Sequence, residues 1–181
     1  EWVGAVTITA LVVAYTLTGG LKAVIRTDVF QGVIALGLLW LGLTIVVNDS
    51  GGLSSAMATI SSSEDTAGLL SRTGNYTLLI WTSTMILWLF ADPMFPQLYQ
   101  RLCAAESDES IGRMATFYPT VAWLAFLPPI LIGTIGHIYH PGLDRSGGDN
   151  ILPTLILEVG GEWFGGLVLV AGLAALMSTM D

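Results

Sequence analysis

The chain has 181 residues, of which 53% are hydrophobic and only 11% are charged. Soluble domains carry about 25% charged residues, so this composition, with a mean hydropathy of +0.72, excludes an ordinary soluble domain and indicates an integral membrane protein. The net charge of −8, with six basic residues that do not cluster, excludes a nucleic-acid-binding surface, and the single cysteine, Cys103, excludes an internal disulfide.

Five apolar segments are predicted to cross the membrane as helices. A helix needs ~20 residues to cross ~30 Å of hydrocarbon, and it satisfies its own backbone hydrogen bonds in lipid, which an open strand does not. In chain order the segments are about 2–18, 22–47, 75–99, 110–138 and 162–181. The first lacks a basic leading region and a small-residue cleavage site, so we expect a mature span rather than a signal peptide. The predicted fold class is an all-α integral membrane protein, with residues 1–181 in a single membrane domain.

The segments between these helices are predicted to be loops and turns. Gly19-Gly20 predicts a tight turn between the first two helices. Residues 48–74 and 139–161 are polar and contain glycine pairs, which predicts two longer loops, and residues 100–113 form a short charged segment.

The basic residues predict which loops face the cytoplasm. Cytoplasmic loops carry an excess of Lys and Arg. Four of the six basic residues fall on one side of the predicted helices and two on the other: Lys22, Arg26, Arg101 and Arg113 against Arg72 and Arg145. We therefore expect a multi-pass plasma-membrane protein with 19–27 and 100–113 cytoplasmic, and with residue 1, 48–74 and 139–161 extracellular.

The third apolar segment contains a predicted break at Asp92-Pro93 and Pro96. A proline inside a helix removes a donor and clashes with the carbonyl four residues earlier. Discontinuous membrane helices are where many transporters bind their substrates, so the break is a candidate substrate site. A simple proline kink, with Asp92 near the cytoplasmic end, is the alternative.

The last apolar segment carries Ala175, Ser178 and Thr179, spaced so that they share one helix face. Two hydroxyl oxygens and a backbone carbonyl suit a hard cation such as sodium, since hard cations take oxygen ligands. The alternative is that the hydroxyls bond back to their own helix and that the small residues serve helix packing.

Asp28 lies about two turns into the second helix, ~10–12 Å from its start, and Gln31 follows it on a similar face. An acid at that depth is expensive in lipid and usually functional, so we expect it to guide a cation towards the cytoplasm. The alternative is a salt bridge to Arg26 or Arg101. Asp181 occupies a similar position in the last helix. The sequence shows no nucleophile–base pair, metal-ligand cluster or phosphate-binding loop, so we do not expect an enzyme.

Three stretches of the chain resemble the sodium:solute symporter family. The first runs Tyr15-Thr-x-x-Gly-Gly-Leu-x-Ala-Val-x-x-Thr-Asp-x-x-Gln31. The second is Gln100-Arg101-Leu-Cys-Ala-Ala-Glu-Ser, and the third is Ala174-Ala-Leu-Met-Ser-Thr-Met-Asp181. They occur in the family's order and cover nearly the whole chain.

The resemblance implies a leucine-transporter-type fold with two inverted repeats of five helices. The first two helices here would close the first repeat, and the other three would open the second, beginning with the broken helix. Because the chain lacks an initiating Met and stops inside a helix, we expect a fragment of a longer transporter that does not transport alone.

The resemblance also implies roles for residues in three groups. Sodium would bind the Ala175 carbonyl and the hydroxyls of Ser178 and Thr179. Tyr15, Asp28 and Asp181 would lie along the cation exit path, although Asp181 stands where some members have a hydroxyl for a second sodium. The substrate cavity would be lined from the broken helix by Trp88, Ala91, Asp92, Met94 and Phe95.

The expected function is sodium-coupled secondary active symport of a small organic solute. The Asp-Pro-Met-Phe-Pro stretch resembles that of family members for proline, pantothenate or carboxylates, and the resemblance implies such a solute rather than a sugar. Sodium is the coupling ion and no other cofactor is expected; the partners are sodium, the solute, the lipid bilayer and the rest of the same transporter chain, but not nucleic acid. The alternatives are a solute-sensing membrane domain of a signalling protein and a channel-like or structural membrane subunit.

Overall fold

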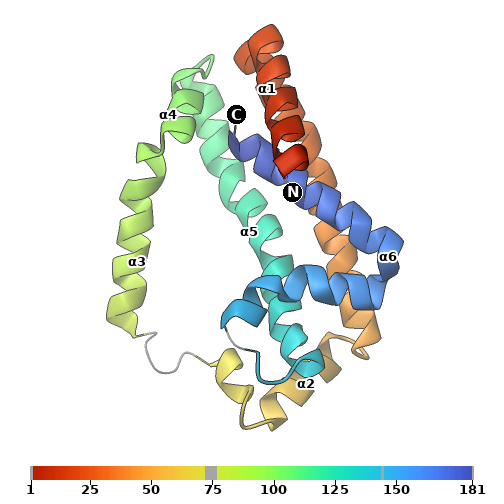
Figure 1. The fold of residues 1–181 in the computed structure, drawn as a ribbon. Coiled ribbons are helices and arrows are strands. Elements are labelled where there is room, and N and C mark those ends of the chain that lie inside the picture. The colour runs from red at the N-terminus through yellow and green to blue at the C-terminus, as the bar shows by residue number, and fades with distance from the viewer. Residues whose placement is uncertain (1, 72–76, 144, 181) are drawn as a thin grey trace. The chain divides into compact units, whose positions relative to one another are not determined.

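The computed structural model describes residues 2–71, 77–143 and 145–180. Within that range some side chains lie outside the description: those of Trp2, Ala5, Ile8, Leu11, Tyr15, Thr16, Leu21, Asp92, Gln97, Arg145, Ser146 and residues 176–180. Every regular element in the described part is helical and none is a strand (Figure 1), which confirms the all-α prediction.

The helices follow one another in a simple order. The elements are α1 (Trp2–Asp49), α2 (Leu53–Ser62), the 3₁₀ helix η1 (Ala67–Leu70), α3 (Leu78–Ala91), the 3₁₀ helix η2 (Asp92–Met94), α4 (Pro96–Cys103), α5 (Asp108–Tyr139) and α6 (Arg145–Met180).

Three stretches of the described helices are long and apolar enough to cross a membrane: Lys22–Asp49, Asp108–Tyr139 and Gly147–Ala175. Helix α3 is apolar but has only 14 residues, which at 1.5 Å per residue reach about 21 Å, short of the ~30 Å hydrocarbon core. The chain is therefore a membrane protein, while the count of five spans and the inverted repeat stay predictions.

Both α1 and α6 are broken by a glycine. Gly20 has φ 59° and ψ −167°, and Gly161 has φ 78° and ψ 169°. Residues with a Cβ avoid this region of backbone conformation, whereas glycine enters it freely. The break at Gly20 confirms the turn predicted from Gly19-Gly20.

The described helices form two compact units by their contacts, one of residues 1–57 and 127–181 and one of residues 58–126. In the first unit α1 packs against α6 (Figure 1). Their core also includes the end of α5 and one residue of α2, and its buried members are Leu43, Val46, Ala56, Ile132, Ile135, Leu155, Ile156 and Val168.

Glycines allow the helices of this unit to come close together. A Cβ on Gly136 of α5 would lie 2.5 Å from Ile151 Cγ1 of α6, and one on Gly42 of α1 would lie 3.2 Å from Ile156 Cδ1. The contact at Gly136 leaves no room for a Cβ unless Ile151 moves, and the contact at Gly42 is tight, so glycine at these positions lets α1 and α5 approach α6 closely.

The loops predicted at 48–74 and 139–161 need correction because both contain helices. Helix α6 begins at Arg145, and α2 and η1 lie between residues 53 and 70. Ile151, Leu155 and Ile156 are all buried; Ile151 and Leu155, four residues apart, share one helix face, and Ile156 borders it. The glycine pairs at either end of this short apolar face obscured it in the sequence. Whether these segments are extracellular stays a prediction.

The second unit contains the broken helix. Helix α3 ends at Ala91, η2 follows, and Phe95 is extended (φ −66°, ψ 124°) before Pro96 opens α4. Pro96 occupies the first turn of α4, where the missing N–H costs nothing, and it disfavours a helical conformation at the residue before it. The predicted interruption of this helix is therefore confirmed.

Candidate functional site

The candidate cation path begins on α1 just after the break at Gly20. Val24, Asp28 and Gln31 are spaced at i, i+4 and i+7, so they share one face of α1. Val24 is 3% exposed, which shows that this face turns into the protein. The Asp28 Oδ1 and Gln31 Oε1 atoms are both shielded from solvent. The second half of α1 therefore presents two polar side chains inward.

The opposite side of the same helix is apolar and exposed. Ile25, Val29 and Phe30 all keep a large part of their surface accessible. Thr27 does not contribute a free hydroxyl, because its Oγ1 donates to the carbonyl oxygens of Ala23 (3.2 Å) and Val24 (2.8 Å). A membrane helix that is polar inside and apolar outside is typical of one that lines a path or a site.

The predicted sodium ligands lie on the last part of α6. The backbone is helical from Glu162 to Met180, so Ala175, Ser178 and Thr179 keep the spacing that places them on one face. Ala175 is exposed, whereas the side chains of Ser178 and Thr179 lie outside the described residues. The sodium-site assignment stays a prediction.

Two members of the predicted exit path also lie outside the description. These are the side chain of Tyr15 and the whole of Asp181. Asp28 is the one member of that group whose side chain is placed, and it lies on the inward face described above. The role of all three on a cation path stays a prediction.

The residues predicted to line the substrate cavity lie around the break between α3 and α4. Trp88, Met94 and Phe95 are exposed within their unit, and Ala91 is half-buried. The Asp92 side chain is outside the description. A broken helix that presents large apolar side chains is able to contact a small organic solute, but the structure does not test whether these five residues do so.

A cavity of about 310 Å³ lies beside the break, and the sequence did not reveal it. It is formed between α4, α5 and the 3₁₀ turn, and its lining residues are Pro93, Leu98, Arg101, Leu102, Met114 and Tyr118. Trp88, Ala91, Met94 and Phe95 are not among these described lining residues, and the Asp92 side chain lies outside the description. The available signal was the i, i+4 spacing of Leu98 with Leu102 and of Met114 with Tyr118, which gives each helix one apolar stripe facing the other.

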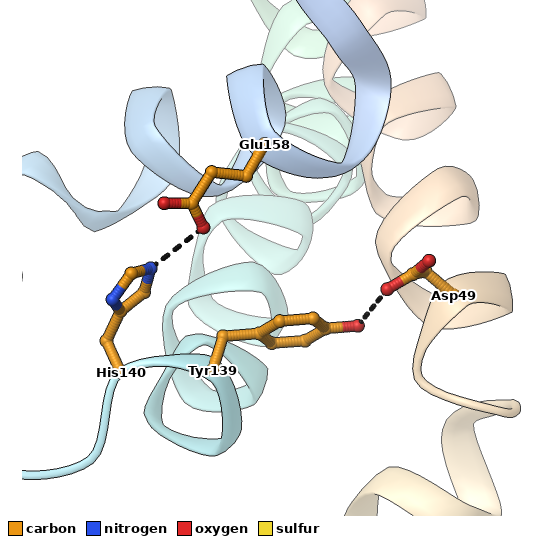
Figure 2. A network of polar contacts seen from close by, with 4 residues as sticks. All are labelled: Asp49, Tyr139, His140 and Glu158. Carbon is orange, nitrogen blue, oxygen red and sulfur yellow. Dashed lines mark hydrogen bonds and ion pairs between the residues drawn. The ribbon is translucent and has the colours of Figure 1, made fainter.

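Two polar pairs at the end of α5 were also missed. The Tyr139 hydroxyl donates a 2.6 Å hydrogen bond to Asp49 Oδ2 at the end of α1, and His140 Nε2 lies 2.9 Å from Glu158 Oε2 of α6. Figure 2 shows the two pairs side by side, with Tyr139 directed to α1 and His140 to α6. They tie the end of α5 to α1 and to α6. Among the residues the structure describes, no three His, Cys, Asp or Glu side chains gather as a metal site.

Comparison with known proteins gives one consistent family. Residues 2–181 match the sodium:solute symporter family. The sodium/pantothenate symporter of Haemophilus influenzae is 28% identical over 92% of this chain and 34% of its own length. The sodium/proline symporter of Escherichia coli is 28% identical over 99% of this chain and 36% of its own length. An uncharacterised symporter of Bacillus subtilis is 25% identical over 95% of this chain and 34% of its own length.

The matches show how much of a whole transporter this chain covers and which class of protein it belongs to. The chain spans about a third of the length of the curated relatives it matches. The family and its named members are transporters, which confirms the expectation that the chain is not part of an enzyme. No solved structure matches the chain.

Proposed function

This chain belongs to the sodium:solute symporter family, and from that premise we propose that it is part of a sodium-coupled secondary active symporter for a small organic solute. The observation that carries the proposal is the match over residues 2–181. The inward polar face of α1 supports it, because a helix in lipid turns Asp28 and Gln31 inward only where the protein uses them.

The proposed coupling site lies on α6. Sodium binds the Ala175 carbonyl and the hydroxyls of Ser178 and Thr179, together with ligands from parts of the transporter outside this chain. The continuous helical backbone through residue 180 supports this, since it preserves the spacing of the three positions. Sodium then leaves towards the cytoplasm past Tyr15, Asp28 and Asp181.

The proposed solute is proline, pantothenate or a similar carboxylate. Two of the similar proteins are named as symporters for pantothenate and for proline, each at 28% identity, so the comparison favours this chemical class without separating its members. The break between α3 and α4 supports a solute-binding role, because backbone groups released from a broken helix are free to bind a solute. Trp88, Ala91, Asp92, Met94 and Phe95 are the residues proposed to line the cavity.

The proposed driving force is the sodium gradient across the plasma membrane. In the proposed topology residues 19–27 and 100–113 face the cytoplasm, so Asp28 lies near the side to which sodium is released. A membrane potential of 100 mV adds roughly 2.3 kcal/mol for each sodium that enters. Solute accumulation therefore follows the sodium gradient and the potential together.

The test is a double substitution in the full-length parent, Ser178→Ala with Thr179→Ala. Loss of two oxygen ligands is expected to abolish sodium-dependent uptake of the solute without changing the amount of protein in the membrane. A matched control is Thr44→Val with Thr134→Val, which removes two hydroxyls that donate to the carbonyl oxygens of Trp40 and Ile130 on their own helices. The control is expected to transport normally. Unchanged sodium-driven uptake in the α6 variant would refute the site assignment.

A further inference from the structure

The cavity between α4 and α5 has no part in the function proposed above. It lies within the unit of residues 58–126, has a volume of about 310 Å³ and is partly open. Most of its lining surface is apolar, so it suits an apolar ligand rather than water, which needs polar partners. The apolar walls come from Leu98 and Leu102 of α4, Met114 and Tyr118 of α5, and Pro93 at the break.

Arg101 is the charged residue among these described lining residues. It already takes part in an interaction of its own, so we assign no ligand charge to it. The methylene stem of an arginine lines apolar surface while its charged end lies elsewhere. The ligand of this cavity is therefore expected to bind through apolar contact.

The α5 wall of the cavity is part of a helix that is able to cross a membrane. The stretch Asp108–Tyr139 is long and apolar enough for this. Met114 and Tyr118 line the cavity and are also 47% and 53% exposed, and Phe117, beside Tyr118, is exposed as well. The cavity is thus continuous with apolar surface that suits contact with lipid.

The position of the cavity along α5 matches the depth of lipid acyl chains. The first turn of α5 contains Asp108 and Glu109, and charged side chains belong at the level of the lipid headgroups. Met114 and Tyr118 follow Asp108 by six and ten residues, which places them about 9 and 15 Å further along the helix axis. The headgroup layer is roughly 5–7 Å thick on each side of the membrane, so both residues lie beyond it.

We propose that this cavity is a binding site for the acyl chain of a bilayer lipid. A chain that moves from the bilayer into the cavity gains nothing from the hydrophobic effect, because both surroundings are apolar. It gains by packing against walls that otherwise lack contact atoms. A carboxylate-bearing solute is a poorer occupant, since its charge would lose water without gaining an assigned partner. Such a lipid site is independent of sodium coupling and of the identity of the solute.

The test maps the contacts of a lipid chain with a photoreactive lipid. The full-length parent is reconstituted in vesicles of phosphatidylglycerol and phosphatidylcholine, in which a small share of the phosphatidylcholine carries a diazirine within one acyl chain. After irradiation, mass spectrometry of peptides locates the labelled residues. Wild type is compared with Met114→Trp, which fills the cavity. The matched control is Phe117→Trp, which adds an indole at an exposed position three residues further along α5.

The expected result is a loss of label confined to the cavity. In wild type the lipid labels Leu98 or Leu102 of α4, and it also labels Phe117. Met114→Trp lowers the labelling of α4 by about fivefold or more, because the indole takes the volume of the chain, while the label on Phe117 is unchanged. Phe117→Trp leaves the labelling of α4 at its wild-type level.

A second variant, Met114→Ala, covers the case in which Met114→Trp fails to reach the membrane. It widens the cavity instead of filling it, so it is expected to keep the labelling of α4 at or above the wild-type level. A fall in this labelling would show that Met114 is not a wall of a lipid site.

Three further outcomes would overturn the proposal. Label on Phe117 but not on Leu98 or Leu102 in wild type would show that another part of the full-length protein fills the cavity. Equal labelling of α4 in Met114→Trp and wild type would show that lipid reaches α4 from outside the cavity. Loss of the α4 label on addition of proline, pantothenate or a short carboxylate would identify the solute as the occupant.

Discussion

The two units of the chain differ in what covers their apolar side chains. In the unit of residues 1–57 and 127–181, Val46, Ile132 and Leu155 have no exposed surface. In the unit of residues 58–126, α3 has no buried residue, and Leu89 and Phe90 remain 67% and 66% exposed. A helix that is apolar on all sides belongs in lipid or inside a larger protein. The first unit therefore supplies its own core, whereas the broken helix depends on its surroundings.

The difference matters for how the two candidate sites work. The inward face of α1 belongs to the unit in which Gly42 and Gly136 let helices come into close contact. The break between α3 and α4 belongs to the unit in which α3 has no buried residue, so less of this unit holds it in one conformation. We expect a firmly positioned cation path and a more adaptable solute site.

The largest expected effect is a loss of stability when a close contact in the first unit is filled. A Cβ on Gly165 would overlap the Leu157 side chain and lie 3.2 Å from Leu157 Cα, whereas a Cβ on the neighbouring Gly166 meets nothing within 4 Å. Gly165→Ala is expected to destabilise the full-length protein by about 1–3 kcal/mol, measured as a lower midpoint of thermal unfolding in detergent. Gly166→Ala is the control and is expected to leave the midpoint unchanged or slightly raised. Equal midpoints for the two variants would show that the first unit is not closely packed.

The next effect comes from repairing the break in the second unit. Pro93→Ala with Pro96→Ala removes both helix breakers, and a continuous helix across residues 91–96 is expected to lower uptake by about tenfold or more, because the solute groups are no longer positioned. The amount of folded protein in the membrane is measured alongside uptake, and it is expected to match that of wild type.

Pro141→Ala is the control for this variant, because Pro141 lies in an exposed turn after α5. It is expected to change neither uptake nor stability. Wild-type uptake by the double proline variant would mean that the break has no part in binding the solute.

The smallest effect comes from a polar contact at the end of α5. Tyr139→Phe removes the hydrogen bond to Asp49 (Figure 2) and is expected to cost about 1 kcal/mol or less, because the pair is reached by solvent. Thermal unfolding of the same preparation measures this loss. Tyr99→Phe, a change at a 61% exposed tyrosine of α4, is the control. If both variants unfold at the wild-type temperature, the contact does not fasten α5 to α1.

The breaks in the helices could be predicted from the sequence because their causes are local. Gly20 permits a backbone conformation that other residues avoid, and Pro93 and Pro96 lack the N–H that a continuous helix needs. The start of α6 at Arg145 was missed for a related reason. The glycines at 147–148 and 160–161 indicate turns on their own, whereas the segment between them is helical and packs Leu155 into the core, a contact that the local sequence does not reveal.

Only those residues of the candidate site that are unusual in a membrane helix by themselves could be predicted from the sequence. An acid such as Asp28 stands out in an apolar helix because of its cost in lipid. Whether an atom of Gln31 has a partner depends on residues far away in the chain, as does the bond between Tyr139 and Asp49, which are 90 residues apart. The cavity between α4 and α5 depends in the same way on how two helices pack.

The central claim is sodium-coupled symport of a small carboxylate-bearing solute. The most direct measurement is uptake of labelled proline, pantothenate and short carboxylates by cells that make the full-length parent, with and without an inward sodium gradient. The account predicts that one of these solutes accumulates and that its accumulation collapses when the gradient is removed. Uptake that is indifferent to sodium, or no uptake of any member of the class, would contradict it.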